Sequence, residues 1–99
     1  MILEISYIQV AKDNLVPFEL AVEKAVDDII STSKGFIDFK TCRGLEEETT
    51  YVFMVWWETL EDHIIGFRES ELFQKWRNII DPYFEKPPIF AGHWEAETK

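Results

Sequence analysis

The chain has little cysteine, little glycine and few basic residues. Its one cysteine, Cys42, cannot form an intramolecular disulfide, and four glycines leave little room for a glycine-rich phosphate loop. Nineteen acidic residues against ten basic ones give a formal net charge of −9, and the basic residues are scattered along the sequence. Because a field of this sign repels nucleic acids and anionic membrane surfaces, we expect neither as a partner.

Long apolar runs are also missing. The longest one, Tyr51–Trp57, is far shorter than the roughly 20 residues that span a bilayer. Residues 1–10 show neither the basic segment nor the sustained apolar segment of a secretory signal. Together with the single cysteine, these features predict a cytoplasmic setting.

What the chain does contain is apolar and aromatic surface. Of its 99 residues 46% are hydrophobic and 15% are aromatic, which is rich for a domain of this size. We expect a single domain over residues 1–99, with 95–99 as a flexible tail. Some of the apolar surface should serve an interface or a ligand pocket.

Hydrophobic periodicity predicts the order strand, helix, strand, strand, helix, strand. We expect strands at 2–11, 36–43, 51–57 and 89–95. The first helix should begin at an Asp13 or Asn14 cap and run to about Ser31, with Lys34-Gly35 closing it. Thr59 and Ser70 are further cap candidates, so the second helical region is either two short helices or one helix kinked at Ser70.

The strand at 51–57 contains no charged residue and should be covered on both faces. Of Trp56 and Trp57, one should face the helices and the other the opposite side. The element order is that of a split βαβ unit, an α+β domain with an antiparallel sheet and its helices on one face. A second copy of the chain is the simplest cover for the other face, so we expect a homodimer. The strand positions around Glu4 and Lys40 look tolerant of solvent.

Three segments of the second half resemble a known family: Trp57-Glu58-Thr59-Leu60-Glu61-Asp62-His63, Gly66-Phe67-Arg68-Glu69-Ser70 and Phe73-Gln74-Lys75-Trp76-Arg77. With the His93-Trp94 strand they are similar to the antibiotic biosynthesis monooxygenases of the dimeric α+β barrel superfamily. The resemblance implies a ferredoxin-like βαββαβ subunit. It also implies two sheets packed back to back in a homodimeric barrel and a cavity between each sheet and its own helices.

The same resemblance implies a set of site residues. Cofactor-free members line the pocket with a Trp, a polar aromatic and an Arg, and Trp57, His63 and Arg77 occupy the matching positions, with His in place of Tyr. The Asn that these members carry shortly before the Trp is Phe53 here. Haem-degrading members carry their His ligand at the position of Arg77, so the match implies no haem, and we expect no cofactor.

The nature of the side chains allows two interpretations of each candidate. A histidine such as His63, with an ordinary pKa near 6.5, could take a proton from a phenol or enol, or it could be a partly exposed helix residue bonded to Glu61 or Asp62. Arg77 could hold a phenolate or a developing peroxide, or it could be a solvated partner of Asp81. Trp57 could form a flat wall for a substrate or simply pack in the core.

Further residues have weaker assignments. The expected substrate-binding side chains besides Trp57 are Phe67, Phe73, Trp76 and Tyr83, with Tyr83 and Phe84 as a lid over the cavity mouth. Arg68 and Glu69 should lie on the surface, His93 at the dimer face, and Cys42 as a half-buried thiol. His63 and His93 have no Cys or acid at ligand spacing, so no metal site is expected.

Two functions follow from these expectations. The first is a cofactor-independent monooxygenase acting on a small aromatic or polyketide-like substrate, with His63 as the proton acceptor and Arg77 stabilising the anion. The alternative is a non-catalytic dimeric protein that binds a small hydrophobic molecule, for example in a stress response.

Overall fold

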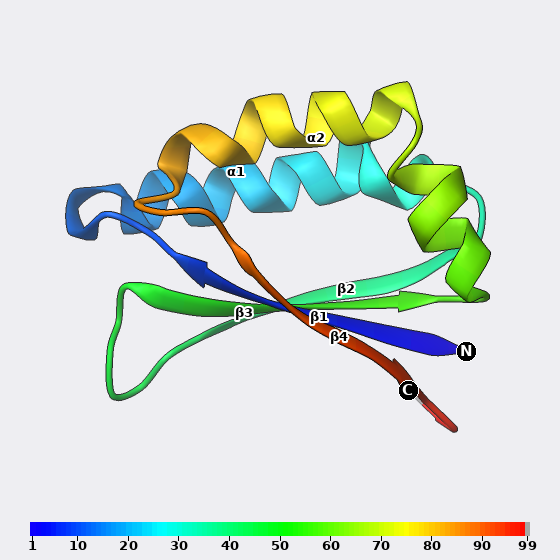
Figure 1. Cartoon of the computed structure of the whole chain (residues 1–99). Coiled ribbons are helices and arrows are strands. Elements are labelled where there is room, and N and C mark those ends of the chain that lie inside the picture. The colour runs from blue at the N-terminus through cyan, green and yellow to red at the C-terminus, as the bar shows by residue number, and fades with distance from the viewer. Residues whose placement is uncertain (99) are drawn as a thin grey trace.

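A computed structural model describes residues 1–98 of the chain, as one sheet and a layer of helices (Figure 1). The main elements are β1 (Ile2–Gln9), α1 (Leu15–Asp28), β2 (Phe36–Arg43), β3 (Thr50–Trp57), η3 (Asp62–Phe67), α2 (Glu71–Ile80) and β4 (Ile89–Glu95). The strands lie in the order β2-β3-β1-β4, and every neighbouring pair is antiparallel. The predicted α+β, ferredoxin-like fold is therefore confirmed.

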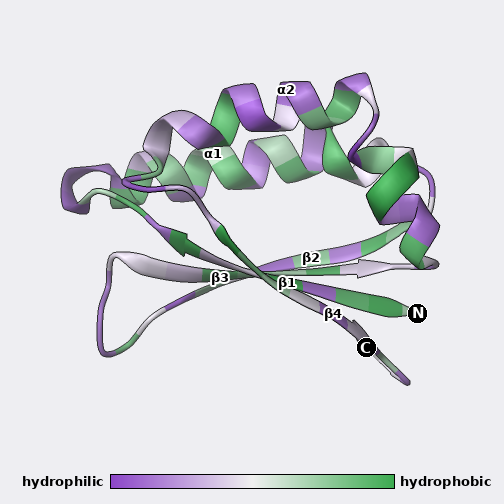
Figure 2. Cartoon of the chain, in the orientation of Figure 1, coloured by the Kyte–Doolittle hydropathy of each residue, from purple (hydrophilic) through white to green (hydrophobic). Residues whose placement is uncertain are grey.

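The two faces of the sheet differ in what covers them. Both long helices lie over the same face, and no described element covers the other (Figure 1). In Figure 2 each helix carries hydrophobic and hydrophilic residues in alternation, as amphipathic helices do. Along β3 the buried side chains Tyr51, Phe53, Val55 and Trp57 share the helix side, because alternate residues of a strand point the same way. The neighbouring Trp56 therefore faces the opposite side, which confirms the predicted division of the two tryptophans.

The core lies between the sheet and α1. Phe18, Val22 and Ala25 of α1 are buried at spacings of four and three residues, the stripe that the sequence predicts. The Phe18 ring stacks on Phe53 with 6.0 Å between centroids and meets Tyr51 at 5.0 Å. These contacts hold α1 against β3. A different set of side chains lies between the sheet and the α2 and η3 helices.

The ends of α1 differ from the prediction. Residues Lys12–Asn14 form a 3₁₀ turn, and Asn14 stands at the N-cap without a side-chain cap hydrogen bond. The helix ends at Asp28, and a second 3₁₀ turn over Ile30–Thr32 completes the connection. Gly35 follows with φ +83°, and a Cβ there would collide with the side chain of Asp62. Gly35 is thus required by the approach of η3 rather than as the helix cap.

The second helical region is two helices, one of the predicted alternatives. The Thr59 hydroxyl accepts the Asp62 N–H at 3.1 Å and begins the first of them. This helix, η3, is a π-helix, in which the Arg68 N–H donates to the His63 carbonyl at 3.0 Å, an i→i+5 hydrogen bond. Ser70 then stands at the N-cap of α2 as predicted, but its hydroxyl donates to the Phe67 carbonyl at 2.6 Å.

Some local expectations need correction. Cys42 is exposed rather than half-buried, because β2 is an edge strand and this position points away from the helices. Of the expected flexible tail, Glu95 belongs to β4 and the Ala96 N–H donates to the Met1 carbonyl at 2.9 Å, while Lys99 lies outside the described residues. Within residues 1–98, no helix is both long and apolar enough to cross a membrane.

Candidate functional site

A cavity of about 320 Å³ lies between the sheet and the α2 side of the helix layer. Its walls come from β1, β2, β3, η3, α2 and β4, so it is built from both halves of the chain. Seven Phe and Trp rings contribute to the wall: Phe39, Phe53, Phe67, Phe73, Trp76, Phe84 and Phe90. The polar groups of the wall include Glu4, His63, Arg68 and Arg77. Such a combination of apolar walls and a few convergent polar groups is typical of small-molecule sites.

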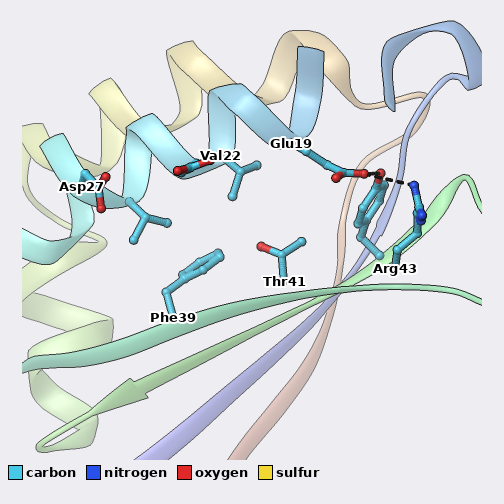
Figure 3. Close-up of a pocket in the computed structure, with 9 residues that line it drawn as sticks. Glu19, Val22, Asp27, Phe39, Thr41 and Arg43 are labelled. Carbon is cyan, nitrogen blue, oxygen red and sulfur yellow. Dashed lines mark hydrogen bonds and ion pairs between the residues drawn. The ribbon is translucent and has the colours of Figure 1, made fainter. Parts of the chain in front are cut away.

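A second hollow, of about 360 Å³, lies between α1 and β2 (Figure 3). Its polar groups already bind one another: the Tyr51 hydroxyl donates to Glu19 at 2.6 Å, and Arg43 lies 3.5 Å from the same carboxylate oxygen. Burial and the neighbouring Glu19 raise the pKa of Tyr51 to about 12, which keeps the donor protonated. Because this hollow contains no predicted site residue, the cavity under α2 is the candidate site.

Glu4 and His63 form the polar end of that cavity. Glu4 is on β1 and faces the helices, and its Oε1 accepts the Trp57 indole N–H at 3.0 Å. His63 Nε2 lies 3.2 Å from the same oxygen, and both side chains are largely buried. Glu4 Oε2 has no hydrogen-bond partner among residues 1–98. Since every fully buried side-chain nitrogen or oxygen of these residues has a partner, Oε2 must be accessible. Oε2 is therefore the carboxylate oxygen that a molecule in the cavity can reach.

The other ring nitrogen of His63 meets a second histidine. His63 Nδ1 lies 2.7 Å from His93 Nε2 on β4, a distance at which a proton must lie between the two rings. His63 also stacks on Trp57, with 5.4 Å between centroids and 19° between planes. The imidazole of His63 is thus fixed on three sides, by Glu4, His93 and Trp57.

Burial shifts the pKa values of this cluster in opposite directions. Desolvation raises the pKa of Glu4 to about 7, partly offset by the Trp57 hydrogen bond and by the charge of Arg68. Desolvation together with His93 and Arg68 lowers the pKa of His63 to about 4. Burial and Arg68 also lower the pKa of His93. Near neutral pH the two histidines are uncharged, and Glu4 can both accept and release a proton.

Two guanidinium groups flank the Phe73 ring at the edge of the cavity. Arg77 lies 5.8 Å from its centroid and Arg68 6.0 Å. Arg77 Nε also donates to Asp81 Oδ2 at 2.8 Å, so the solvated ion pair foreseen as its alternative role exists. The guanidinium of Arg68 has no carboxylate within ion-pair distance among residues 1–98. An anion in the cavity mouth would therefore meet Arg68 without displacing a partner.

The structure brings most predicted site residues together. His63, Arg77, Phe67, Phe73 and Trp76 all line the cavity. Trp57 and Tyr83 differ from the prediction. Trp57 is 0% exposed and stacks on His63 outside the cavity wall. The Tyr83 ring packs against Phe18, with 6.0 Å between centroids. Its neighbour Phe84 does line the cavity.

Two residues of the site lie elsewhere than predicted from sequence. Glu4 is largely buried rather than solvent tolerant, and His93 faces His63 on the helix side of the sheet instead of the opposite face. Arg68 is exposed, as predicted, and also forms part of the cavity wall. For Glu4 a signal exists, because it shares strand parity with the inward-facing Ile8 and Val10. For His93 no local signal exists, since the irregular register of β4 opposite Ile5 and Ser6 decides which way it points.

Metal binding has no support within residues 1–98, where no group of three potential metal-ligating side chains gathers. Two histidines alone do not complete the four-ligand set that zinc prefers.

Comparison with known proteins identifies the family and the fold. The family model for antibiotic biosynthesis monooxygenase matches residues 1–79. The uncharacterized protein YczJ of Bacillus subtilis is 39% identical over 71 residues, which is 72% of this chain and 74% of that protein. A Bordetella bronchiseptica protein named after the same monooxygenases has a crystal structure with a TM-score of 0.89 and 30% identity, covering 98% of this chain and 97% of its own. SnoaB of Streptomyces nogalater, a cofactor-independent oxygenase, shares the fold at 12% identity and a TM-score of 0.78, covering 99% of this chain and 94% of its own.

Proposed function

Because the chain belongs to the antibiotic biosynthesis monooxygenase family, we propose that it is a cofactor-independent monooxygenase acting on a small aromatic or polyketide-like molecule. One arrangement supports this function above all others. The pair of Glu4 and His63 lines a cavity whose wall also contains seven Phe and Trp rings. Flat, electron-rich molecules pack well on such walls, and a base at one end can ionise them.

The first chemical step is a proton transfer. A phenol or enol in the cavity gives its proton to Glu4, whose Oε2 is open and whose pKa of about 7 suits exchange near neutral pH. His63 supports this step from the other oxygen of the carboxylate. The electron-rich anion then gives two electrons to O₂ and forms a C–O bond to a peroxide, which takes up a proton. Loss of the hydrogen still on that carbon, as a proton, breaks the O–O bond: one oxygen stays as the C=O of the product and the other leaves as water. The substrate thus supplies all four electrons, and no external reductant is needed.

The anion that forms requires a positive partner. Arg68 and Arg77, which both lie close to the Phe73 ring, supply it by charge-assisted hydrogen bonds to the phenolate or to a peroxide oxygen. Arg68 is the stronger candidate because its charge has no partner among the described carboxylates, whereas Arg77 already forms an ion pair with Asp81. The sequence drew attention only to Arg77, and Arg68 extends the assignment.

A homodimer completes the proposed enzyme. The uncovered face of the sheet is apolar at its centre, where the half-buried Leu3, Ile5, Val52 and Met54 lie. Tyr7, Ile89 and Trp94 continue this face and are about half exposed, at 50%, 58% and 48%. Exposed apolar surface of this extent is typical of an interface, and a two-fold arrangement would pair this face with itself. A second copy of the chain is thus its proposed cover.

The alternative function is a dimeric protein that binds a small hydrophobic molecule without reaction. The specific observation in its favour is the Arg77–Asp81 pair, which holds the predicted anion-stabilising residue in a solvated ion pair. In that case the cavity would retain its aromatic ligand, and Glu4 and His63 would only satisfy one another's hydrogen bonds.

Oxygen uptake separates the two functions. Purified protein is mixed with anthrone or 1-naphthol, and oxygen consumption is recorded for the wild type, Glu4→Gln and Glu46→Gln, the last being an exposed loop control. Monooxygenation predicts turnover by the wild type and the control, and a loss of roughly 10²-fold or more in Glu4→Gln. Tight binding of both compounds without oxygen uptake by any variant would support the alternative.

A further inference from the structure

We propose that Glu4, His63 and His93 form a proton relay that connects the cavity with solvent at the β4 edge of the sheet. The relay deepens the proposed function and rests on it for its catalytic use, but its existence can be tested in the free protein. Its three members come from three elements, β1, η3 and β4, which only the folded sheet brings together.

The contacts form an unbroken chain of proton-carrying atoms. Glu4 Oε1 lies 3.2 Å from His63 Nε2, and His63 Nδ1 lies 2.7 Å from His93 Nε2. The last nitrogen of the chain, His93 Nδ1, has no hydrogen-bond partner among residues 1–98. His93 is only half-buried, whereas His63 is 4% exposed. One end of the chain thus lies in the cavity and the other end at the edge of the sheet.

The surroundings keep both rings neutral, which a relay of this kind needs. The groups that face His63 are Glu4 from β1, His93 from β4, Trp57 from β3 and Arg68 from the end of η3. The two neighbouring positive or potentially positive groups, Arg68 and His93, lower the pKa of His63, as burial does. His63 therefore stays uncharged near neutral pH, and a proton that binds to one of its ring nitrogens is balanced by the loss of a proton from the other.

Two arrangements of the chain differ by one proton. In the first, Glu4 is a carboxylate, His63 carries its proton on Nε2, and His93 carries its proton on Nε2. When His93 Nδ1 takes a proton from water, the His93 Nε2 proton moves to His63 Nδ1 and the His63 Nε2 proton moves to Glu4 Oε1. The result is a protonated Glu4 and two neutral histidines whose protons now sit on Nδ1. The reverse sequence releases a proton from Glu4 Oε1 to water. It can carry away a proton received on Oε2 once the carboxyl group has turned that proton toward His63 and both histidines carry their protons on Nδ1.

This exchange predicts a change that can be seen by spectroscopy. When the network gains its proton, His63 must switch its N–H from Nε2 to Nδ1 while the ring stays neutral. A histidine that merely fills space would keep one tautomer. Nitrogen-15 NMR of the imidazole rings distinguishes the two nitrogens, and the chain has only two histidines to assign.

The experiment uses the full chain labelled with ¹⁵N-histidine, without substrate, between pH 8 and pH 6. We expect His63 to change tautomer across this range in the wild type and in the exposed-site control Glu58→Gln. In Glu4→Gln, where position 4 cannot take up a proton, the switch is lost. A single His63 tautomer throughout in the wild type, or a switch that persists in Glu4→Gln, would overturn the relay.

A second variant tests the role of His93. Gln in His93→Gln can hydrogen-bond to His63 but cannot pass a proton, so the tautomers of His63 should interconvert at least about tenfold more slowly. An unchanged or faster interconversion would remove His93 from the relay. If only the oxygenase proposal fails, the wild type will still show the tautomer switch by NMR, but neither anthrone nor 1-naphthol will cause oxygen uptake.

Discussion

The indole N–H of Trp57, the last residue of β3, donates to Glu4 Oε1 at 3.0 Å and thereby holds the Glu4 carboxyl group of β1 at the edge of its ring. Trp57 is fully buried, and its ring also supports His63 by stacking. The tryptophan therefore positions both members of the acid–base pair without touching the cavity. This arrangement gives a direct way to separate the packing of Trp57 from its hydrogen bond.

Trp57→Phe keeps an aromatic ring but removes the donor. We expect the free energy of unfolding to fall by about 1–3 kcal/mol, because a buried carboxyl loses a hydrogen bond. The pKa of Glu4 should rise above its value of about 7, since the Trp57 hydrogen bond is the main influence that lowers it. Urea unfolding and carbon-13 NMR of Glu4 measure the two effects. An unchanged Glu4 pKa would show that the bond does not form in solution.

Glu4→Gln should change how stability depends on pH. The folded pKa of Glu4 is about 7, above its ordinary value of 4.5, so between these pH values the folded state binds a proton that the unfolded state has lost. The wild type therefore loses stability relative to Glu4→Gln as the pH rises from 4.5 to 7, by at most about 1.4 kcal/mol per pH unit. Chemical unfolding of both proteins at several pH values tests this. A difference that grows in favour of the wild type would have the wrong sign.

Asp81→Asn should strengthen the binding of an aromatic anion. Releasing Arg77 from its carboxylate frees a guanidinium at the cavity edge, and exposed ion pairs are worth roughly 0.2–1 kcal/mol, so affinity should rise by up to about fivefold. The probe is 2-naphthoate, with binding measured by calorimetry, and Arg77→Gln is the counterpart that should weaken binding. Equal affinity in all three proteins would mean that Arg77 does not face the ligand.

Met54→Glu should separate the proposed dimer. Met54 lies on the uncovered face of the sheet, where two copies related by a two-fold axis would bury two carboxylates. We expect sedimentation velocity to give a dimer for the wild type at micromolar concentration and a monomer for this variant. The control, Leu45→Glu, changes a residue that is 95% exposed in the β2–β3 turn and should leave the dimer intact. A monomeric wild type would contradict the interface.

The periodicity of the chain was sufficient to predict the fold. Strand alternation and the Phe18, Val22 and Ala25 stripe are local patterns, and each is visible within a single element. The same holds for Ser70, whose place before α2 is a local signal. Helix ends were less predictable, because Gly35 is fixed by the approach of Asp62 from another element.

The site was only partly predictable because its chemistry arises from contacts between distant elements. His63 was recognised as a candidate, but its partners Glu4 and His93 lie on two other strands. The pKa shifts of Glu4 and His63 come mainly from burial, which depends on how the whole sheet packs against η3. Trp57 was left open between a pocket wall and core packing, because a sequence does not tell whether a buried ring faces a cavity or supports a residue that does.

The most direct test of the central claim is the fate of ¹⁸O₂ in single-turnover reactions with anthrone, followed by mass spectrometry of the product and of the water formed. Proton transfer to Glu4 followed by monooxygenation predicts one labelled atom in the product and one in water, with the reaction slowed roughly 10²-fold or more in Glu4→Gln. A product without label, or a labelled product formed equally fast by Glu4→Gln, would contradict it.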